Sequence, residues 1–384
     1  MDKIKCGILT INTSLMNYGN RLQNYALQRV LERQECEVAT VNYTPTYPES
    51  SYRDLRIAAA QTALRAKKHR WKKVVNLAIR GVLRRRNRKA QKEKREKYNA
   101  FIRDYIKWTS EEYTLDSELA PLGEKFDFMI AGSDQIWNPY WEGTQPIYFM
   151  QFVPENKRIA YAASFGVSSI PDQIKSMYGD YLKSIPRISC RENTGCDLVE
   201  ELTQKKAIQV LDPVFLLEQN DWQKIEEKPD AVSTDKPYIL VYFLGDIEKE
   251  TAKKIKRLQK KNGCRLIYLD RNDKLNSCFA SPTEFLYLIH HAAIVCTDSF
   301  HGCAFSIAFN RPFVCFQRTL NNGAAQDMSS RLTSLFDLLQ CNRYDTALSF
   351  SEMAKMDYDE INSILQKEKK KSLEFLMDAL HAGK

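Results

Sequence analysis

The chain has 384 residues, of which 43% are hydrophobic and 27% are charged, and its formal net charge is +9. This composition excludes disordered, collagen-like and coiled-coil proteins, and the length is that of about two domains. No run of about 18 apolar residues predicts a membrane span, and Met1–Asn12 contains no apolar segment or cleavage site typical of a secretion signal. We therefore expect a cytoplasmic protein.

The first half of the chain predicts alternating strands and helices. A β-rich run at residues 5–12 is followed by helical apolar spacing over 19–34 and by a second strand at 36–43. A strand, a helix and a strand of this length form a βαβ unit, which requires a parallel sheet. Further strands are predicted at 125–131, 158–164 and 187–190, and further helices at 171–184 and 193–204.

Positive charge is concentrated between Arg65 and Lys97, where sixteen Lys or Arg and two Glu leave the rest of the chain mildly acidic. Apolar residues recur at helical spacing within this segment, at Trp71, Val75, Ala78 and Val82. The segment therefore predicts a basic amphipathic helix or helix pair. This helix could bind an anionic membrane surface, face solvent without a partner, or bind nucleic acid. The acidic remainder makes nucleic acid the least favoured, and we expect none.

A polar segment, residues 219–236, contains Pro229, is followed by Pro237 and predicts a linker, after which a second βα series begins. That series comprises strands at 238–243, 265–269 and 294–298 and helices ending at 262 and spanning 281–292. We predict an N-terminal α/β domain (1–218) with a basic helical insertion at about 54–107, the linker, a C-terminal α/β domain (237–345) and a helical tail (346–384). The tail is expected to pack back across the domain junction.

Ten cysteines are scattered along the chain without CxxC spacing, and several lie in apolar runs, as Cys296 and Cys315 do. There a thiol packs as a small hydrophobic group. Neither the cysteines nor the five histidines cluster at metal-ligand spacing in the sequence. We predict reduced core cysteines, no bound cofactor and no metal site, and we leave open a divalent cation near Asp134.

Polar loops follow two of the predicted strands in the first half. In an α/β sheet, functional side chains gather at the carboxyl ends of the strands. The first loop opens a helix, where Gly19 and backbone amides could hold an anion, although Asn17 or Asn20 could simply cap the helix. In the second loop, Asp134 is a candidate general base and Trp137 a candidate sugar platform, or the same residues could form an Asx-capped turn.

Two further loops offer a cation and an imidazole. Arg191 ends a strand and could bind a carboxylate or phosphate, or could form a structural pair with Glu192 or Asp212. His301 begins a helix just after a buried strand, beside Asp298 and Ser299, and could act as an acid, a base or a hydrogen-bond donor. A satisfied structural histidine is the alternative.

Taken together, these loops resemble the polysaccharide pyruvyl transferase family from about Ile4 to about Leu339. The resemblance lies in six blocks that occur in the same order: Tyr18-Gly19-Asn20-Arg21-Leu22-Gln23-Asn24-Tyr25-Ala26-Leu27-Gln28, Gly132-Ser133-Asp134-Gln135-Ile136-Trp137-Asn138-Pro139, Tyr161-Ala162-Ala163-Ser164-Phe165-Gly166, Arg191-Glu192, Leu211-Asp212-Pro213-Val214, and Asp298-Ser299-Phe300-His301-Gly302 with Phe305-Ser306.

The resemblance implies two Rossmann-like domains in a bilobed, GT-B-like arrangement with a cleft between them. It also implies transfer of a pyruvyl group from phosphoenolpyruvate to hydroxyls of a sugar, forming a pyruvate ketal in surface-polysaccharide biosynthesis. In this interpretation His301 and Asp134 are catalytic, and Arg191 and Ser299 bind the donor. The residues expected to line the acceptor or the surrounding loops are Tyr18, Gly19, Asn20, Asn24, Ser133, Gln135, Trp137, Asn138, Glu192 and Asp298.

One position departs from the family pattern. Ser299 stands where some members have an arginine, so a second cation for the donor phosphate must come from elsewhere. Arg331 and Arg318 are the candidates, because a dianion desolvated by one arginine is poorly compensated.

Acceptors in such pathways are often lipid-linked sugars, which favours a peripheral location at the inner face of the membrane for an enzyme with a basic amphipathic segment. Two alternatives remain open from the sequence. One is a nucleotide-sugar glycosyltransferase of the same bilobed fold, and the other is a non-catalytic protein that binds sugars or anions.

Overall fold

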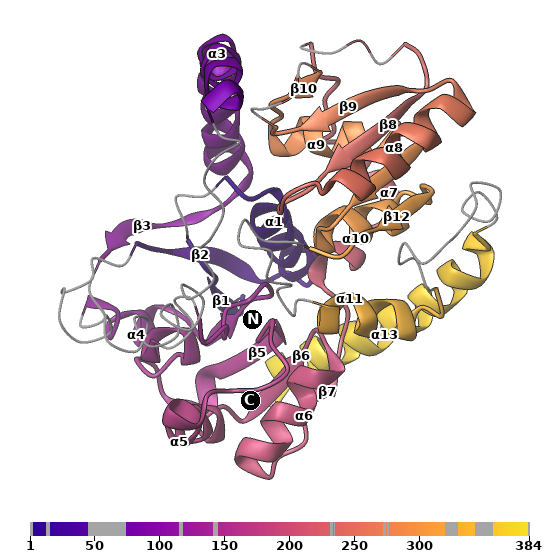
Figure 1. The fold of residues 1–384 in the computed structure, drawn as a ribbon. Helices are drawn as coiled ribbons and strands as arrows, with labels where there is room; N and C mark the ends of the chain where they lie inside the picture. The colour runs from indigo at the N-terminus through magenta and orange to yellow at the C-terminus, as the bar shows by residue number, and fades with distance from the viewer. Residues whose placement is uncertain are drawn as a thin grey trace.

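The computed structural model describes residues 3–12, 16–44, 74–114, 118–140, 145–230, 233, 235–271, 274, 276–318, 329–341 and 356–382. Two parallel sheets, one from each half of the chain, organise this part of the protein (Figure 1). The fold class expected from the sequence, an α/β protein with two Rossmann-like sheets, is confirmed.

The first sheet has seven strands in the order β3-β2-β1-β4-β5-β6-β7, and every neighbouring pair is parallel. The strands are β1 (Lys5–Leu9), β2 (Glu37–Tyr43), β3 (Trp108–Tyr113), β4 (Phe128–Ala131), β5 (Arg158–Ala163), β6 (Arg187–Cys190) and β7 (Ile208–Gln209). Both β4 and β5 are buried along their whole length, as their continuous apolar sequences require. The helices of this half are α1 (Tyr18–Arg33), α3 (Val74–Tyr105), α4 (Leu122–Lys125), α5 (Asp172–Lys183) and α6 (Asn193–Thr203).

The second sheet has five parallel strands in the order β10-β9-β8-β11-β12. They are β8 (Tyr238–Tyr242), β9 (Arg265–Leu269), β10 (Ser277–Cys278), β11 (Ile294–Thr297) and β12 (Phe313–Cys315). The helices of this half are α8 (Lys249–Asn262), α9 (Pro282–His290), α10 (Phe300–Ala308) and α11 (Ser329–Leu338). The crossing point of this sheet lies between β8 and β11, the position at which open α/β sheets present their functional loops.

A short helix, α7 (Gln219–Gln223), lies within the segment predicted as a linker. It starts with a capping box between Glu218 and Asp221. The helix was not predicted, because the segment is polar. Its Trp222 is fully buried, with ring centroids 5.8 Å from Tyr25 of α1 and 5.0 Å from Phe305 of α10. The connection between the halves is therefore packed between α1 and α10 at this point, and we call α7 with its buried Trp222 the α7 wedge.

The C-terminal helix, α13 (Tyr358–His381), returns to the first half of the chain. The Ser372 hydroxyl accepts a hydrogen bond from the Leu211 backbone amide at 2.9 Å, and Lys369 pairs with Glu218. The ring of Phe375 lies 6.4 Å from that of Tyr161 on β5. As expected from the sequence, the tail crosses back over the junction.

The basic segment continues into the single long helix α3, while residues 65–73 lie outside the described part of the chain. The end of α3 nearer β3 joins the two halves: the buried Lys94 forms an ion pair with the half-buried Asp270, 2.5 Å from its carboxylate, and Lys97 pairs with Glu284. Among the described residues, no helix is long and apolar enough to cross a membrane.

Lys94→Ala is expected to lower the free energy of unfolding by about 1–3 kcal/mol, because it leaves the half-buried Asp270 carboxylate without its cation and with Tyr18 as a remaining donor. Burial already raises the pKa of Asp270 despite Lys94 and Tyr18. A carboxyl group with a raised pKa destabilises the folded state when it ionises. The loss of unfolding free energy in Lys94→Ala should therefore become smaller as the pH falls from about 7 toward about 4. Urea unfolding at several pH values measures both effects. The exposed Lys92→Ala, on the same helix, should change stability by less than about 0.5 kcal/mol.

Candidate functional site

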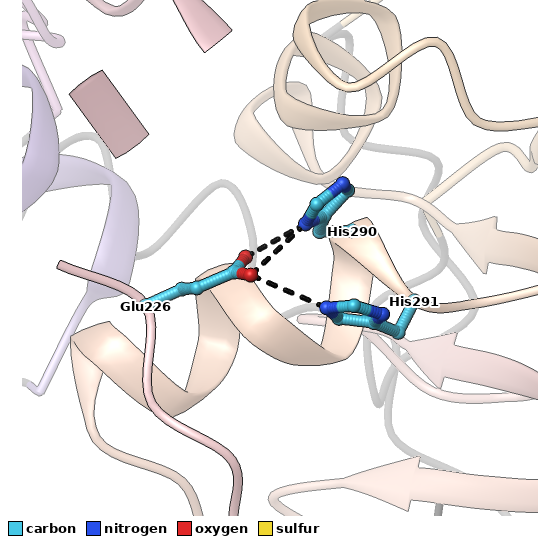
Figure 2. Close-up of side chains that lie close together, drawn as sticks. All are labelled: Glu226, His290 and His291. Atoms are coloured by element: carbon cyan, nitrogen blue, oxygen red, sulfur yellow. Dashed lines mark hydrogen bonds and ion pairs between the residues drawn. The ribbon is translucent and has the colours of Figure 1, made fainter. Parts of the chain in front are cut away.

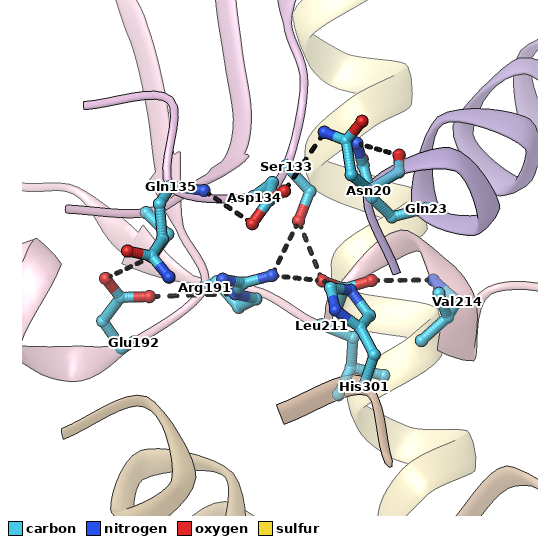
Figure 3. Close-up of polar contacts among 12 residues, drawn as sticks. Asn20, Gln23, Ser133, Asp134, Gln135, Arg191, Glu192, Leu211, Val214 and His301 are labelled. Carbon is cyan, nitrogen blue, oxygen red and sulfur yellow. Dashed lines mark hydrogen bonds and ion pairs between the residues drawn. The ribbon is translucent and has the colours of Figure 1, made fainter. Parts of the chain in front are cut away.

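The loops at the carboxyl ends of strands from both sheets meet at one place (Figure 3). Ser133 and Asp134 follow β4, Arg191 follows β6, and His301 lies in the first turn of α10 after β11. One contact between the two halves here joins Nε2 of His301 to Oδ2 of Asp212, 3.6 Å apart. The structure thus brings together the two predicted catalytic residues and the predicted donor-binding arginine.

Asp212 is the centre of this group, although the sequence did not single it out as a site residue. Its Oδ2 accepts hydrogen bonds from Ser133 Oγ at 2.9 Å and Arg191 Nη1 at 2.7 Å, and its Oδ1 accepts one from the Val214 amide at 3.1 Å. Burial alone would raise the pKa of Asp212, but His301 and Arg191 hold it well below its ordinary value. The available signal was the Leu211-Asp212-Pro213-Val214 block, and the Arg191–Asp212 pair weighed from the sequence is present.

Arg191 is only partly engaged by its neighbours. Its guanidinium carbon lies 4.2 Å from the centroid of the Phe300 ring, and its Nε lies 3.9 Å from a carboxylate oxygen of Glu192. The Nε and Nη2 groups are buried and donate no hydrogen bond to any described residue. The other oxygen of Glu192 accepts from the Ser164 hydroxyl and from the amides of residues 165 and 166, so Glu192 is held in place beside Arg191.

Arg331, on α11, brings a second buried guanidinium to the site. Burial, together with the nearby charges of Arg191 and Arg318, lowers the pKa of Arg331 to about 9, so the charged form still predominates near pH 7. It forms no ion pair with the carboxylates of the described residues, and its Nε has no hydrogen-bond partner among them. Its contact is the side-chain amide of Gln135, whose oxygen, turned toward it, lies 2.6 and 3.0 Å from the two terminal nitrogens.

Arg318 completes a group of three arginines. It donates from Nη2 to the backbone oxygen of Asp298 at 3.0 Å, and its Nε lies 3.5 Å from the Asp298 carboxylate. That carboxylate also accepts from the amides of Leu244 and Gly245, at 2.7 and 2.8 Å, so Asp298 orients Arg318. The site therefore gathers cations from both halves of the chain, and Arg331 is the one without a carboxylate partner among the described residues.

His301 is positioned by a helix start and by a glycine. Ser299 is the N-cap of α10, accepting from the Gly302 amide at 3.4 Å, which confirms that His301 begins a helix. The imidazole packs directly on Gly19 of α1, where an added Cβ would lie 1.9 Å from Nδ1 of His301. Nε2 of His301 has no hydrogen-bond partner among the described residues, so it is available to a ligand.

Asp134 has a backbone φ of +76°, a conformation that costs a non-glycine residue free energy and that concentrates at functional sites. Its carboxylate accepts hydrogen bonds from Asn20 Nδ2 at 3.1 Å and from the Gln135 amide at 2.9 Å. Arg21, a buried arginine that the sequence analysis did not select, lies close enough to interact electrostatically with Asp134. Its Nε and Nη1 donate no hydrogen bond to a described residue.

The structure places several predicted loop residues in structural roles. Trp137 was predicted as a sugar platform, but this is wrong: it is fully buried, stacks on Phe149 and donates its indole N–H to a backbone oxygen. Asn24 is also fully buried and exchanges hydrogen bonds with Thr40 of β2. The side-chain amide of Asn138 contacts that of Gln135 at 2.7 Å inside its own loop. Apolar packing accounts for the position of Trp137, and polar contacts account for those of Asn24 and Asn138.

The loop before α1 was predicted either to hold an anion or to cap the helix. Asn17 caps the helix, its side chain accepting from the Asn20 amide at 3.3 Å, so the capping alternative is confirmed. Tyr18 points toward the second half of the chain, where its hydroxyl donates to Asp270 at 2.7 Å. Tyr18 therefore joins the two halves of the molecule.

A cluster of potential metal ligands lies away from Asp134, near which a divalent cation was left open. Within the described ranges, the one group of three His, Cys, Asp or Glu side chains whose ligand atoms lie within 4.8 Å of one another comprises Glu226, His290 and His291 (Figure 2). This group lies at the end of α9 and beside the α7 wedge. The sequence did not reveal it, because 64 residues separate Glu226 from His290.

Solved structures similar to the chain share little sequence with it. A protein from Listeria monocytogenes assigned as a UDP-N-acetylglucosamine 2-epimerase has a TM-score of 0.47 and 9% identity, over 97% of this chain and 91% of that one. The UDP-GlcNAc 2-epimerase of Neisseria meningitidis has 0.44 and 10%, over 98% and 100%. A glycosyltransferase of Streptomyces sp. SF2575 has 0.42 and 11%, over 97% and 99%. No curated protein sequence matches the chain.

The family model for polysaccharide pyruvyl transferase matches residues 17–318. The match extends from the start of α1 in the first half to the segment after β12 in the second, and it includes Arg191, Asp212 and His301. Since it covers well over half of the chain, the family resemblance found in the sequence is confirmed. The chain belongs to the polysaccharide pyruvyl transferase family.

Proposed function

We propose that this transferase takes its pyruvyl group from phosphoenolpyruvate and joins it to two hydroxyls of a sugar as a cyclic ketal. The observation that carries the proposal is the buried group of Arg191, Arg318 and Arg331, with Arg331 lacking a carboxylate partner among the described residues. A donor with a phosphate and a carboxylate supplies the negative charge that would compensate these guanidinium groups, and arginine binds both groups bidentately.

His301 has the position of a general acid in this scheme. Its Nε2 is free of hydrogen bonds to described residues and lies 3.6 Å from the ionised Asp212, a neighbour that stabilises a protonated imidazole. Proton transfer from His301 to C3 of phosphoenolpyruvate converts the methylene to a methyl group and makes C2 electrophilic. The arginines would stabilise the charge on the phosphate as it departs.

The remaining steps join the sugar to C2. A first hydroxyl oxygen bonds to C2 as Asp134, our candidate base, takes its proton. The bond between C2 and the phosphate oxygen then breaks, and inorganic phosphate leaves with the bonding electrons. A second hydroxyl closes the ketal at C2, and its proton is released with the phosphate. One sugar and one phosphoenolpyruvate thus give one ketal and one phosphate.

The first test is calorimetric titration of the purified protein with phosphoenolpyruvate, beside inorganic phosphate and UDP. We expect phosphoenolpyruvate to bind at least about tenfold more tightly than phosphate, because its carboxylate adds a second charged contact. Arg191→Ala should remove this binding. Circular dichroism must show the variant folded, since Arg191 also pairs with Asp212. The exposed Arg257→Ala is the control. Binding of UDP without phosphoenolpyruvate would contradict the proposal and favour the glycosyltransferase alternative.

Gly19→Ala should reduce phosphate release from phosphoenolpyruvate in the presence of acceptor sugar by about 100-fold, because the new methyl group displaces the His301 imidazole. The helix itself should tolerate alanine, which favours helical backbone. Gly123→Ala is the matched control, because the nearest atom to its new Cβ is 3.5 Å away. Equal activity of the two variants would show that the packing of His301 on α1 is not needed.

We further propose that the acceptor is lipid-linked and that the basic segment holds the enzyme at the anionic inner face of the membrane. Each Lys or Arg near an anionic surface contributes about 1 kcal/mol. The test replaces the Lys and Arg residues of 65–88 with Gln, leaving Lys94 and Lys97 and their ion pairs intact. Co-sedimentation with vesicles containing phosphatidylserine should fall strongly. The control replaces the basic residues of α8, and equal losses in both variants would count against the proposal.

A further inference from the structure

Two histidines and a glutamate converge beside the wedge that connects the halves of the chain. His290 is the last residue of α9 and His291 follows it as the C-cap, while Glu226 comes from the segment after α7. Nδ1 of His290 lies 2.8 Å and Nε2 of His291 3.2 Å from the Glu226 carboxylate (Figure 2). The segment that joins the two sheets thus contacts the end of a helix from the second half.

The three donor atoms have the spacing that a small divalent cation requires. In tetrahedral zinc sites with bonds of about 2.0–2.1 Å, neighbouring ligand atoms lie about 3.3 Å apart. With Oε1 of Glu226 as the carboxylate ligand, Nδ1 of His290 lies 3.1 Å and Nε2 of His291 3.2 Å from it, and all three ligand atoms lie within 4.8 Å of one another. Two imidazoles and one carboxylate form a ligand set that zinc uses with a water molecule at the fourth position.

The two rings are held in orientations that aim these nitrogens at Glu226. The ring of His290 stacks on Phe309 at 4.7 Å, and the ring of His291 stacks on Tyr287 at 4.1 Å. The other nitrogen of His290, Nε2, contacts the side-chain amide of Gln223 at 3.2 Å. A hydrogen-bonding partner on the second ring nitrogen is typical of metal-bound histidines, because it fixes the tautomer and the ring direction.

Access and charge also suit a cation. The His291 side chain is 41% exposed, so solvent reaches the group, and the two histidines lie at the carboxyl end of α9, where the helix dipole is negative. Arg311 is a cation close enough to interact with His290, and the Glu226 carboxylate offsets the positive charge of Arg311. Because these charges balance, the free energy of binding an ion here would come from coordination bonds to the three side chains.

We propose that Glu226, His290 and His291 bind one Zn²⁺ ion, which fixes the connecting segment to α9. Glu226 lies four residues after Trp222, the side chain buried between the two halves, so the ion would stabilise the junction on which the site depends. The ion is structural in this proposal and takes no part in the transfer reaction.

The test uses tag-free, full-length protein, stripped with a chelator, desalted and kept reduced. Titration with ZnCl₂ should give one tight site, and Zn²⁺ should raise the melting temperature. In His291→Ala, which alters the most exposed ligand, the affinity should fall at least about tenfold and the temperature shift should disappear. His381→Ala changes an exposed histidine at the end of α13 and should behave like the wild type.

Cobalt distinguishes this site from binding by the ten cysteines. The Co²⁺ protein should show the visible d–d bands of a nitrogen- and oxygen-ligated ion without thiolate charge-transfer bands, and His291→Ala should lose them. Unchanged Zn²⁺ affinity in His291→Ala would overturn the proposal, as would thiolate bands in the wild type. Neither result depends on the donor or acceptor of the enzyme, so failure here is separate from failure of the proposed function.

Discussion

Arg331→Met is expected to abolish detectable phosphoenolpyruvate binding while raising the melting temperature of the protein. The guanidinium is buried beside two other arginines and forms no ion pair with a described carboxylate, so its charge opposes folding when no anion is bound. Replacing a poorly compensated buried charge with an apolar side chain is typically neutral or stabilising, by up to about 4 kcal/mol. Losing a buried charged contact to the donor should weaken binding by at least about 100-fold.

Calorimetric titration and thermal unfolding, each with and without phosphoenolpyruvate, measure the two effects on one preparation. The wild type should gain melting temperature on adding the donor, and Arg331→Met should not, because only the folded wild type binds it. Arg257→Met, an exposed arginine on α8, controls for the loss of a positive charge. A variant that melts below the wild type yet still binds the donor would mean that Arg331 is a structural residue and that the donor lies elsewhere.

The sequence predicted the parallel sheets because their central strands are continuous apolar runs between helices of clear periodicity. The strands β1, β4 and β8 and the helices α1 and α6 lie within a few residues of their predicted positions. The strands that were not predicted are edge or short strands. Strand β3 has the polar sequence Trp-Thr-Ser-Glu-Glu-Tyr at the sheet edge, and β10 has two residues, so neither shows a buried pattern.

The candidate site was predicted by residue type and loop position, and only the fold could supply the pairings. Asp212 follows a two-residue strand, and its three partners come from separate parts of the sequence, so no local spacing marks it. Trp137 lies in a polar loop that predicts exposure, yet an aromatic cluster covers it. Arg331 was selected because a doubly charged donor needs a second cation. No local sequence pattern around Arg331 indicates this role.

Asp212→Asn is expected to reduce kcat by about 100- to 10,000-fold, the usual range for loss of general acid–base function. The pKa of Asp212 lies well below its ordinary value of 3.8, so the carboxylate keeps its charge throughout the range in which the enzyme is assayed. In the Asp212→Asn variant, the protonated imidazole of His301 loses its negative neighbour. The loss should therefore appear in kcat, and the acid limb of the wild-type kcat profile owes nothing to Asp212, because this carboxylate is already ionised there.

A double-mutant cycle with His301→Asn tests whether the two residues act as one unit. If Asp212 acts through the imidazole, removing both side chains should cost about as much as His301→Asn alone, because the carboxylate then has nothing to stabilise. Asp246→Asn, which changes an exposed carboxylate, should leave kcat unchanged. Additive losses would instead mean that Asp212 acts through Arg191, to which it is hydrogen-bonded at 2.7 Å, and that the proton on C3 comes from another group.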